Sequence, residues 1–243
     1  MFSFFTKKTF VADSFENMVD IHCHILPGID DGAATTDVSR LMLEKYQSLG
    51  FTKIIATPHV MEDYYQLNST KIQNALSNFK PISKEYQLNL NASAEYLMDN
   101  QLQQLIDTDD LIPLSIENHL LVEMSFFMRP IQLENHLFQL NDKQFKIVMA
   151  HPERYEYLKT ISDFQALKEK GCNFQLNLLS ISGHYGTTVQ KKAELLLQNG
   201  FIDFIGTDAH RPEHLTKIEQ LTVSKTIMEA LQNSIENTKA KFS

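Results

Sequence analysis

Short apolar runs alternate with longer amphipathic ones along almost the whole of this sequence. The apolar runs are typical of strands, and the amphipathic runs are typical of helices of roughly 10 to 17 residues. We expect seven strands, near residues 18–24, 52–58, 88–97, 119–125, 146–151, 172–178 and 201–207. Strands that alternate with helices form parallel β/α units. The pattern therefore predicts a single α/β domain built as a closed or nearly closed barrel, with an open doubly wound sheet as the alternative.

Helix boundaries in the sequence support this alternation. Thr35 or Thr36 can cap a helix that ends at Leu49–Gly50, because a hydroxyl accepts from a free amide and glycine suits the position after a helix. The stretches ISDFQALKEKG and TTVQKKAELLLQNG repeat this scheme before the last two strands. No glycine-rich phosphate loop follows the first strand, so a nucleotide-binding sheet lacks its main signal.

The composition limits the partners of the protein. The 243 residues are 43% apolar and carry a net charge of -8 without a basic run, which disfavours nucleic-acid binding. Two cysteines cannot form a disulfide framework, so we expect a reducing cytoplasm. No apolar run approaches the roughly 20 residues that span a bilayer, so no membrane insertion is expected. We expect residues 1–17 to be an N-terminal extension, packed or loosely ordered, and residues 18–243 to form the domain.

Side chains that commonly bind metals follow six of the seven predicted strands. They are His22, His24, His59, Glu95, Glu123, His151, Asp208 and His210. Parallel β/α barrels assemble their active sites at this end of the strands. A single histidine at a strand end is usually an ordinary polar residue, but Glu123, between Val122 and Met124, is costly to bury unless it is paired or coordinated. The whole set predicts a metal centre.

The donor types narrow the choice of metal. Imidazole and carboxylate ligands favour zinc, manganese or iron over calcium, which prefers oxygen alone. Asp30 or Asp31 adds one more carboxylate, and the sequence leaves that choice open. The set exceeds what one ion needs, so we expect two or three divalent ions. Alternation along a strand should point His22 and His24 to one side and Cys23 to the other. We interpret three of the remaining histidines as helix or surface residues; they are His119, His136 and His214.

Six motifs together resemble a known superfamily. DIHCHILPGIDDGA, ATPH, AEY, LVEMS, HPERY and GTDAH, in this order, are similar to the motifs of the PHP (polymerase and histidinol phosphatase) superfamily. Within it, the likeness is to bacterial manganese-dependent protein-tyrosine phosphatases found beside capsule and exopolysaccharide genes. The resemblance runs from about residue 18 to residue 210 or beyond. It implies a distorted (β/α)7 TIM-like barrel that hydrolyses phosphotyrosine with a metal-activated water. It also implies a protein substrate, the tail of a bacterial tyrosine kinase that controls polysaccharide export.

The resemblance also implies roles for individual residues, with manganese as the metal. The first ion would be held by His22, His24, Glu95 and Asp208. The second would be held by Glu95, as a bridge, with Glu123 and His151. The third would be held by Asp31, in competition with Asp30, and by His59 and His210. Arg154 in HPERY matches a family arginine that helps to bind phosphate, whereas Arg211 departs from the expected spacing of the second one and is its only nearby substitute.

Other functions stay open on the sequence. A histidinol-phosphate phosphatase of the same superfamily is the nearest alternative, and a metal-bound regulatory module without activity is the alternative of a different class. A nuclease is disfavoured by the acidic charge. The tyrosines within residues 60–70, and His184 in SGHYG, either line a pocket for an aromatic ring or belong to ordinary surface loops.

Overall fold

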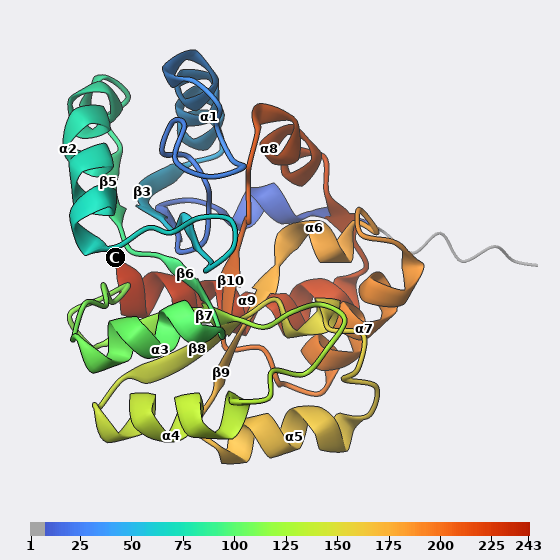
Figure 1. The fold of residues 1–243 in the computed structure, drawn as a ribbon. Coiled ribbons are helices and arrows are strands. Elements are labelled where there is room, and N and C mark those ends of the chain that lie inside the picture. Colours follow the sequence, from blue (N-terminus) through green and yellow to red (C-terminus); the bar gives the residue numbers. More distant parts are fainter. Residues whose placement is uncertain (1–7) are drawn as a thin grey trace, which may run out of the picture.

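The computed structural model describes residues 8–243 as a barrel of parallel strands surrounded by helices (Figure 1). Three strands form one parallel sheet, in the order β2 (Met18–Asp20), β3 (Phe51–Ala56) and β5 (Asn89–Ala92). Six form the other, in the order β10 (Phe204–Gly206), β9 (Asn173–Asn177), β8 (Lys146–Ala150), β7 (His119–Glu123), β6 (Glu95–Leu97) and β4 (His59–Val60). Because β4 continues β3 and β6 continues β5, the strands follow one another around the barrel in chain order.

Residues beyond the first and last strands close the barrel. The amide of Asp208 donates to the carbonyl of His22 at 2.8 Å, and the amide of His24 donates to the carbonyl of Ala209 at 3.0 Å. Asp20 strengthens this seam, since its carboxylate accepts from the Thr207 amide at 3.0 Å and from the Tyr46 hydroxyl at 2.6 Å. The predicted distorted (β/α)7 barrel is therefore confirmed, and the open doubly wound alternative is wrong.

Four of the predicted strands are divided or clearly shortened in the structure. The strand predicted at 88–97 divides into β5 and β6, which lie in different sheets. On the neighbouring strand, Pro58 separates β3 from β4, and a proline has no N–H to continue a ladder. The strand predicted at 18–24 ends at Asp20, and the one predicted at 201–207 begins only at Phe204. Beyond Asp20 the backbone forms the irregular closing contacts instead of a regular ladder.

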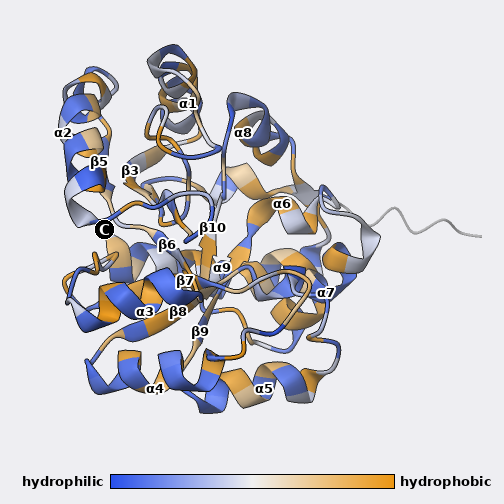
Figure 2. Cartoon of the chain, in the orientation of Figure 1, coloured by the Kyte–Doolittle hydropathy of each residue, from blue (hydrophilic) through white to orange (hydrophobic). Residues whose placement is uncertain are grey.

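Amphipathic helices cover the outside of the barrel, and Figure 2 shows hydrophobic and hydrophilic residues alternating along them. They are α1 (Thr36–Ser48), α2 (Ser69–Glu85), α3 (Asn100–Asp107), α4 (Leu133–Asp142), α5 (Ile161–Glu169), α7 (Thr187–Gln198), α8 (Pro212–Glu219) and α9 (Lys225–Phe242). The short helix α6 (Leu178–Ile181), which directly follows β9, is entirely buried. The hydroxyl of Thr35 accepts from the Val38 amide at 3.3 Å, so Thr35 rather than Thr36 caps α1. Figure 1 shows α3, α4 and α5 along one side of the strands and α1, α2 and α8 along the other.

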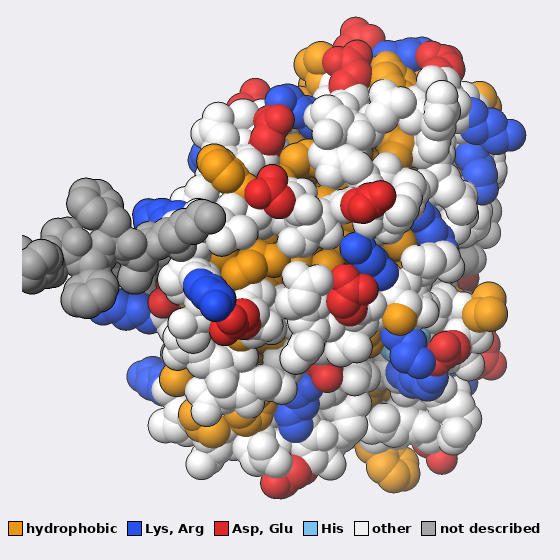
Figure 3. Space-filling view, turned by 180° about the vertical axis from the view of Figure 1, so that it is seen from behind, with side chains coloured by type: hydrophobic (Ala, Val, Ile, Leu, Met, Phe, Trp, Pro, Cys, Tyr) orange, Lys and Arg blue, Asp and Glu red, His pale blue; other side chains and the backbone are white. Residues whose placement is uncertain are grey.

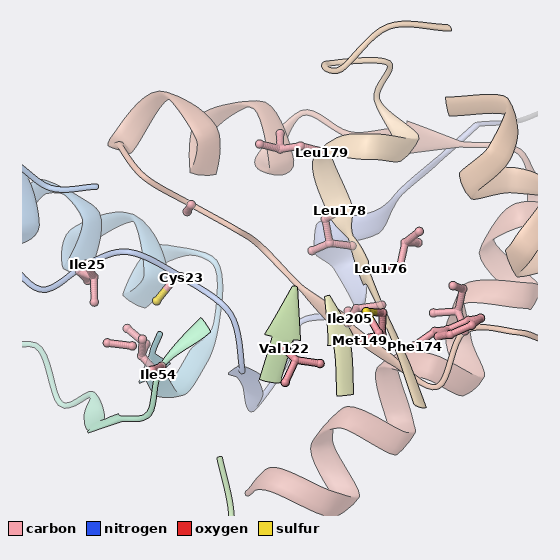
Figure 4. Close-up of a cluster of buried hydrophobic side chains, with 14 of the residues drawn as sticks. Cys23, Ile25, Ile54, Val122, Met149, Phe174, Leu176, Leu178, Leu179 and Ile205 are labelled. Carbon is pink, nitrogen blue, oxygen red and sulfur yellow. The ribbon is translucent and has the colours of Figure 1, made fainter. Parts of the chain in front are cut away.

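Strand residues alternate between two apolar layers. Val148 and Leu121 belong to a cluster inside the barrel, whereas their neighbours Met149 and Val122 pack outward with the helices (Figure 4). Phe242, at the end of α9, joins the interior cluster, with its ring 5.1 Å from that of Phe204. The amino-terminal end of the barrel is thus filled with apolar side chains, and polar groups gather at the carboxyl end.

The N-terminal segment packs on the same body where it is described. β1 (Thr9–Phe10) pairs antiparallel with β11 (Thr222–Val223). Val11, in the 3-10 turn Val11–Ser14, and Phe15 are fully buried. Residues 1–7 of the expected extension lie outside the described residues.

Charges of both signs are scattered over the face turned away from the view of Figure 1, as Figure 3 shows. Among the described residues, no helix is both long enough and apolar enough to cross a membrane.

Candidate metal centre

The alternation of the strands brings polar side chains to the carboxyl end of the barrel interior. Glu123 lies two residues after the inward-facing Leu121, and Asp208 lies four residues after Phe204, so each keeps the inward side. His151 directly follows β8 in a left-handed backbone conformation, with φ 34°, and Asp208 has φ 51°. Left-handed backbone is strained for residues with a Cβ and is often found at functional sites.

Four residues form the centre of the cluster, and they are the set that the family resemblance implies for a first ion: His22, His24, Glu95 and Asp208. The Nε2 atoms of the two histidines lie 3.0 and 3.4 Å from Glu95 Oε2. The same atoms lie 3.5 and 3.3 Å from Asp208 Oδ1. All four side chains are buried. Cys23 points the other way, with its Sγ 3.9 Å from the Ile55 carbonyl, as the alternation predicted although the strand ends earlier.

Glu95 links this centre to a second group. Glu95 Oε2 lies 3.1 Å from His59 Nδ1, which in turn lies 3.0 Å from Glu123 Oε1. Glu95 Oε1 lies 2.8 Å from His151 Nε2, and His151 is 3.8 Å from Glu123 Oε2. The structure therefore brings His151 together with both glutamates, and adds His59 to that group.

In the third group, the two adjacent aspartates, Asp30 and Asp31, face different histidines. Asp31 Oδ1 lies 3.5 Å from His59 Nε2 and 3.5 Å from His210 Nε2. Asp30 turns instead toward His24, whose Nδ1 donates to it at 2.8 Å. Asp31 thus faces the candidate ligands, whereas Asp30 orients one of them. Nothing in the spacing of the motif distinguishes these two roles.

The buried carboxylates of the cluster need positive charge close to them. Burial alone would raise the pKa values of Glu95 and Asp208, but the surrounding histidines hold both well below the usual range. Burial would lower the pKa of His24, yet the carboxylates of Asp30, Asp208 and Glu95 raise it well above its usual value. In the same way, Glu95 and Glu123 outweigh burial and raise the pKa of His59 to about 9. Without a cation, protons on these histidines balance the carboxylates.

The donor set fits divalent metal ions. Within the described residues, His59 Nδ1, Glu95 Oε2 and Glu123 Oε1 are buried and have no partner in hydrogen-bond geometry, although the nitrogen lies 3.1 Å from the first oxygen and 3.0 Å from the second. Buried polar atoms without partners are rare and require an explanation. A bound cation would satisfy all three, and nitrogen with oxygen donors suits manganese, zinc or iron.

A chain of amides, which sequence reasoning missed, supports the first group. His22 Nδ1 donates to Gln175 Oε1 at 2.7 Å, Gln175 Nε2 donates to Asn177 Oδ1 at 3.0 Å, and Asn177 Nδ2 donates to an oxygen of Asp208 at 2.6 Å. Because Nδ1 of His22 carries this proton, its Nε2 is left free for a metal. Gln175 and Asn177 are buried polar residues of β9, the strand without a predicted ligand, and that was the available signal.

At Gly206 the backbone of β10 lies very close to the side chains of His22 and Gln175. A Cβ at this position would lie 2.7 Å from the Cβ of His22 and 2.8 Å from Gln175 Nε2. Both distances are too short for carbon contacts, so only glycine allows β10 to lie so close to the first group.

The cluster opens into a cavity of about 450 Å³ with an arginine on its wall. The Arg154 guanidinium lies between the rings of Phe126 and Tyr185, 4.2 Å from each centroid, and donates to Asp208 Oδ2 at 3.0 Å. Arg211, exposed at the start of α8, also lines the cavity. The cavity lining includes Tyr64, Tyr65, His184 and Tyr185, so these loops do line a pocket, and its use for an aromatic ring stays a prediction.

The prediction that His119, His136 and His214 are helix or surface residues is confirmed for His136, on α4, and His214, on α8, and is wrong for His119, which lies on strand β7. His119, His136 and His214 are all buried. His119 lies on β7 near the floor of the barrel, with its ring 5.0 Å from that of Phe242. His214 lines the cavity, and its Nδ1 accepts from the His210 amide at 3.3 Å. Each of the three lies on the side of its strand or helix that packs against the rest of the protein. The sequence around a single histidine does not show that the residue is buried.

Comparisons with known proteins agree with this geometry. The family model described as capsular polysaccharide synthesis, CpsB/CapC, matches residues 18–237. Tyrosine-protein phosphatase YwqE of Bacillus subtilis strain 168 is 31% identical over 196 residues, 79% of this chain and 77% of its own length. CapC of Staphylococcus aureus is 28% identical over 229 residues, 91% of this chain and 90% of its own.

A solved structure agrees as well. It comes from a crystallographic description of YwqE from Bacillus subtilis and CpsB from Streptococcus pneumoniae as metal-dependent tyrosine phosphatases. It matches with a TM-score of 0.77 at 27% identity, over 93% of this chain and 94% of its own. The family match covers every strand end that contributes to the metal cluster.

Proposed function

This chain belongs to the CpsB/CapC family of capsular polysaccharide synthesis, and on that premise we propose that it is a metal-dependent phosphatase that hydrolyses phosphotyrosine in proteins. The relatives YwqE and CpsB are tyrosine-protein phosphatases. The main support for the proposal is that buried atoms of His59, Glu95 and Glu123 without hydrogen-bond partners lie together beside a cavity that Arg154 also lines. The substrate we propose is the phosphorylated tail of a bacterial tyrosine kinase.

We propose two or three divalent ions, with manganese first and zinc or iron as alternatives. The proposed ligands are His22, His24, Glu95 and Asp208 for one ion, Glu95, Glu123 and His151 for another, and Asp31, His59 and His210 for a third. When bound, such ions supply the Lewis acidity that activates water for attack on phosphorus and neutralises the phosphoryl oxygens.

The protein side chains prepare the phosphate site. Asp208 and the rings of Phe126 and Tyr185 hold the Arg154 guanidinium in one plane, so its remaining N–H groups form a fixed fork for phosphate oxygens. We propose Arg211, across the same cavity, as a second contact to phosphate.

No covalent phosphoenzyme is needed. Burial raises the pKa of the Cys23 thiol well above its ordinary value, and its sulfur faces away from the cluster, so Cys23 is unsuited to be a nucleophile. The hydroxyl of the tyrosine that leaves has a pKa of about 10, which reduces the need for a general acid.

The unit to which we assign this activity is residues 18–243, with residues 1–17 as an N-terminal extension. We propose the cytoplasm as its compartment, since Cys23 and Cys172 are both free, buried thiols.

The test compares substrates on one preparation. The protein would be loaded with manganese and assayed with a phosphotyrosine peptide, a phosphoserine peptide, histidinol phosphate and single-stranded DNA, each with and without a chelator. We expect turnover of the phosphotyrosine peptide above all others, with loss of activity on chelation and its return on adding manganese.

Each alternative predicts a different result. Faster turnover of histidinol phosphate than of the peptide would identify the small-molecule phosphatase. Metal binding without turnover of any substrate would identify a regulatory module. A His22→Ala variant that kept both full activity and full metal content would refute the assignment of the first group.

A further inference from the structure

We propose that the loop between β7 and α4 (residues 124–132, the β7–α4 loop) is a docking surface for the peptide that flanks the phosphotyrosine. The proposal rests on the proposed function and narrows its substrate class. The favoured substrate is an extended phosphotyrosine segment with an apolar side chain near the phosphorylated residue, rather than a small aryl phosphate.

Apolar side chains are unusually exposed on this loop. Phe127 and Met128 are each 72% exposed, and Ile131 is fully exposed. The other large hydrophobic residues exposed among residues 8–243 occur singly along the chain, whereas these three fall within five positions. Contiguous exposed apolar surface marks an interaction site more often than scattered residues do.

The loop is held in place although its side chains are exposed. The Phe126 carbonyl accepts from the Glu156 amide at 2.9 Å, and the Pro130 carbonyl accepts from the Leu133 amide at 3.2 Å. The exposed side chains between these anchors therefore belong to an ordered surface, which loses less conformational entropy on binding than a mobile one.

This surface is continuous with the cavity above the metal cluster. Phe126 forms part of the cavity wall, and Pro130 and Ile131 line a second, smaller cavity of about 270 Å³. The linings of the two cavities also lie close together on the other side, where Met61 lines the first and the next residue, Glu62, donates its amide to Asp99 of the second at 2.8 Å. A peptide with its phosphotyrosine in the first cavity would reach the second by passing along this loop.

A buried histidine in the smaller cavity lacks partners. His136 lines that cavity, is 1% exposed, and within the described part of the chain neither of its ring nitrogens has a hydrogen-bond partner. A neutral imidazole offers one donor and one acceptor, the same pair that a peptide backbone carries. An extended peptide is therefore a better match to this cavity than a purely apolar ligand.

The experiment compares two fully exposed isoleucines. Ile131→Asp changes the proposed surface, and Ile116→Asp makes the same change in the segment before β7, which lies at the opposite end of the strands from the metal cluster. Both variants would be assayed on p-nitrophenyl phosphate, on a phosphotyrosine peptide with leucines on both sides, and on the same peptide with serines instead. Neither side chain is part of the core, so both variants are expected to fold.

The expected result is selective. Ile131→Asp should lower kcat/KM for the leucine peptide by roughly five- to tenfold and leave turnover of p-nitrophenyl phosphate and of the serine peptide unchanged. Ile116→Asp should change none of the three. Equal activity of Ile131→Asp on the leucine peptide would overturn the docking surface, and so would a loss shared by all substrates.

Two further results would contradict a peptide-docking role for the β7–α4 loop in different ways. If the wild type hydrolysed neither phosphotyrosine peptide nor p-nitrophenyl phosphate, the proposed function itself would fail. If light scattering showed a dimer that Ile131→Asp dissociates without changing peptide turnover, the surface would bind a second copy of this chain, and the peptide proposal would be wrong.

Discussion

Asp208 connects the candidate metal ligands to the proposed phosphate contact, Arg154, through its two oxygens. Oδ1 lies within 3.5 Å of the Nε2 atoms of His22 and His24, whereas Oδ2 accepts from Arg154 at 3.0 Å and from Asn177 at 2.6 Å. One carboxylate thus faces the candidate metal ligands on one side and orients Arg154, the proposed phosphate contact, on the other. Its left-handed backbone places both oxygens at once, which explains why strain is tolerated here.

Arg154→Lys tests the guanidinium fork. Lysine keeps the positive charge but loses the planar fork and the stacking between Phe126 and Tyr185, so kcat/KM on a phosphotyrosine peptide should fall by roughly 100-fold. Steady-state kinetics check this, with Arg40→Lys as the matched control, since Arg40 of α1 pairs with Glu85 at the surface. Equal activity of Arg154→Lys and wild type would exclude a role for the fork.

Gln175→Leu tests the amide chain. The change removes the acceptor of His22 Nδ1, so the imidazole is no longer held with Nε2 toward the cluster, and metal affinity should fall by roughly 10- to 100-fold. Competition with a chromophoric chelator measures that affinity. The control is Gln101→Leu, which removes a largely buried glutamine of α3 that donates to the Leu67 carbonyl. If both variants bound metal equally well, the amide chain would not position the ligand.

At the scale of elements, the seam between the first and last strands is the part of the barrel with fewest ladder bonds. Among the described strands, β2 and β10 are not paired directly, and the contacts that join them come from the residues beyond their ends and from Asp20. Tyr46 of α1 donates to the same carboxylate, so a helix, a strand and a loop meet at one buried group. The seam carries His22 and Asp208, and its geometry therefore determines the first metal group.

Asp20→Ala should weaken this seam. It leaves the Thr207 amide, the Thr207 hydroxyl and the Tyr46 hydroxyl without their shared acceptor, and should lower the free energy of unfolding by about 2 to 4 kcal/mol. Urea denaturation of the metal-free protein gives this value directly. Asp142→Ala, at an exposed position of α4, should change it by less than about 0.5 kcal/mol. A similar small effect at Asp20 would mean that the barrel closes without this carboxylate.

At the scale of the whole molecule, the apolar residues that stabilise the barrel interior and the candidate metal ligands lie at opposite ends of the barrel axis. The interior near Phe242 is apolar and filled, while the carboxyl end gathers carboxylates that histidine protons must balance in the absence of metal. Binding of divalent ions replaces those protons, so metal affinity and stability are coupled to pH.

The pKa of His59, about 9 without metal, sets the direction of this coupling. Because it exceeds the ordinary value of about 6.5, protonation contributes stability to the metal-free protein that is complete below pH 6.5 and is lost as the pH rises through 9. Metal displaces that proton, so apparent affinity should rise by about tenfold per pH unit for each proton displaced. The difference in Tm between manganese-loaded and chelated protein should therefore grow from about pH 6 to pH 8.5. Thermal scans at constant ionic strength test this, and a difference that shrinks with pH would contradict it.

Local sequence patterns were enough to predict most strands of the barrel and the candidate metal ligands. The number and order of strands follow from the repeated apolar runs, and the candidate metal ligands follow from their positions at strand ends, because both depend on backbone periodicity. The places where β5 and β6 divide, and where β2 ends, were not predicted, since Pro58 acts on the neighbouring strand and the closing contacts join residues about 187 positions apart.

The sequence by itself determined the parallel β/α units, the end of the strands at which polar side chains gather and the types of candidate metal ligand found there. Only the tertiary structure decided that Asp31 rather than Asp30 faces His59 and His210, and that Gln175 and Asn177 of β9 support His22 and Asp208. The physical reason is that the direction of a side chain in a turn depends on backbone angles that neighbouring residues do not dictate. A hydrogen bond between distant residues exists only once the whole barrel has closed.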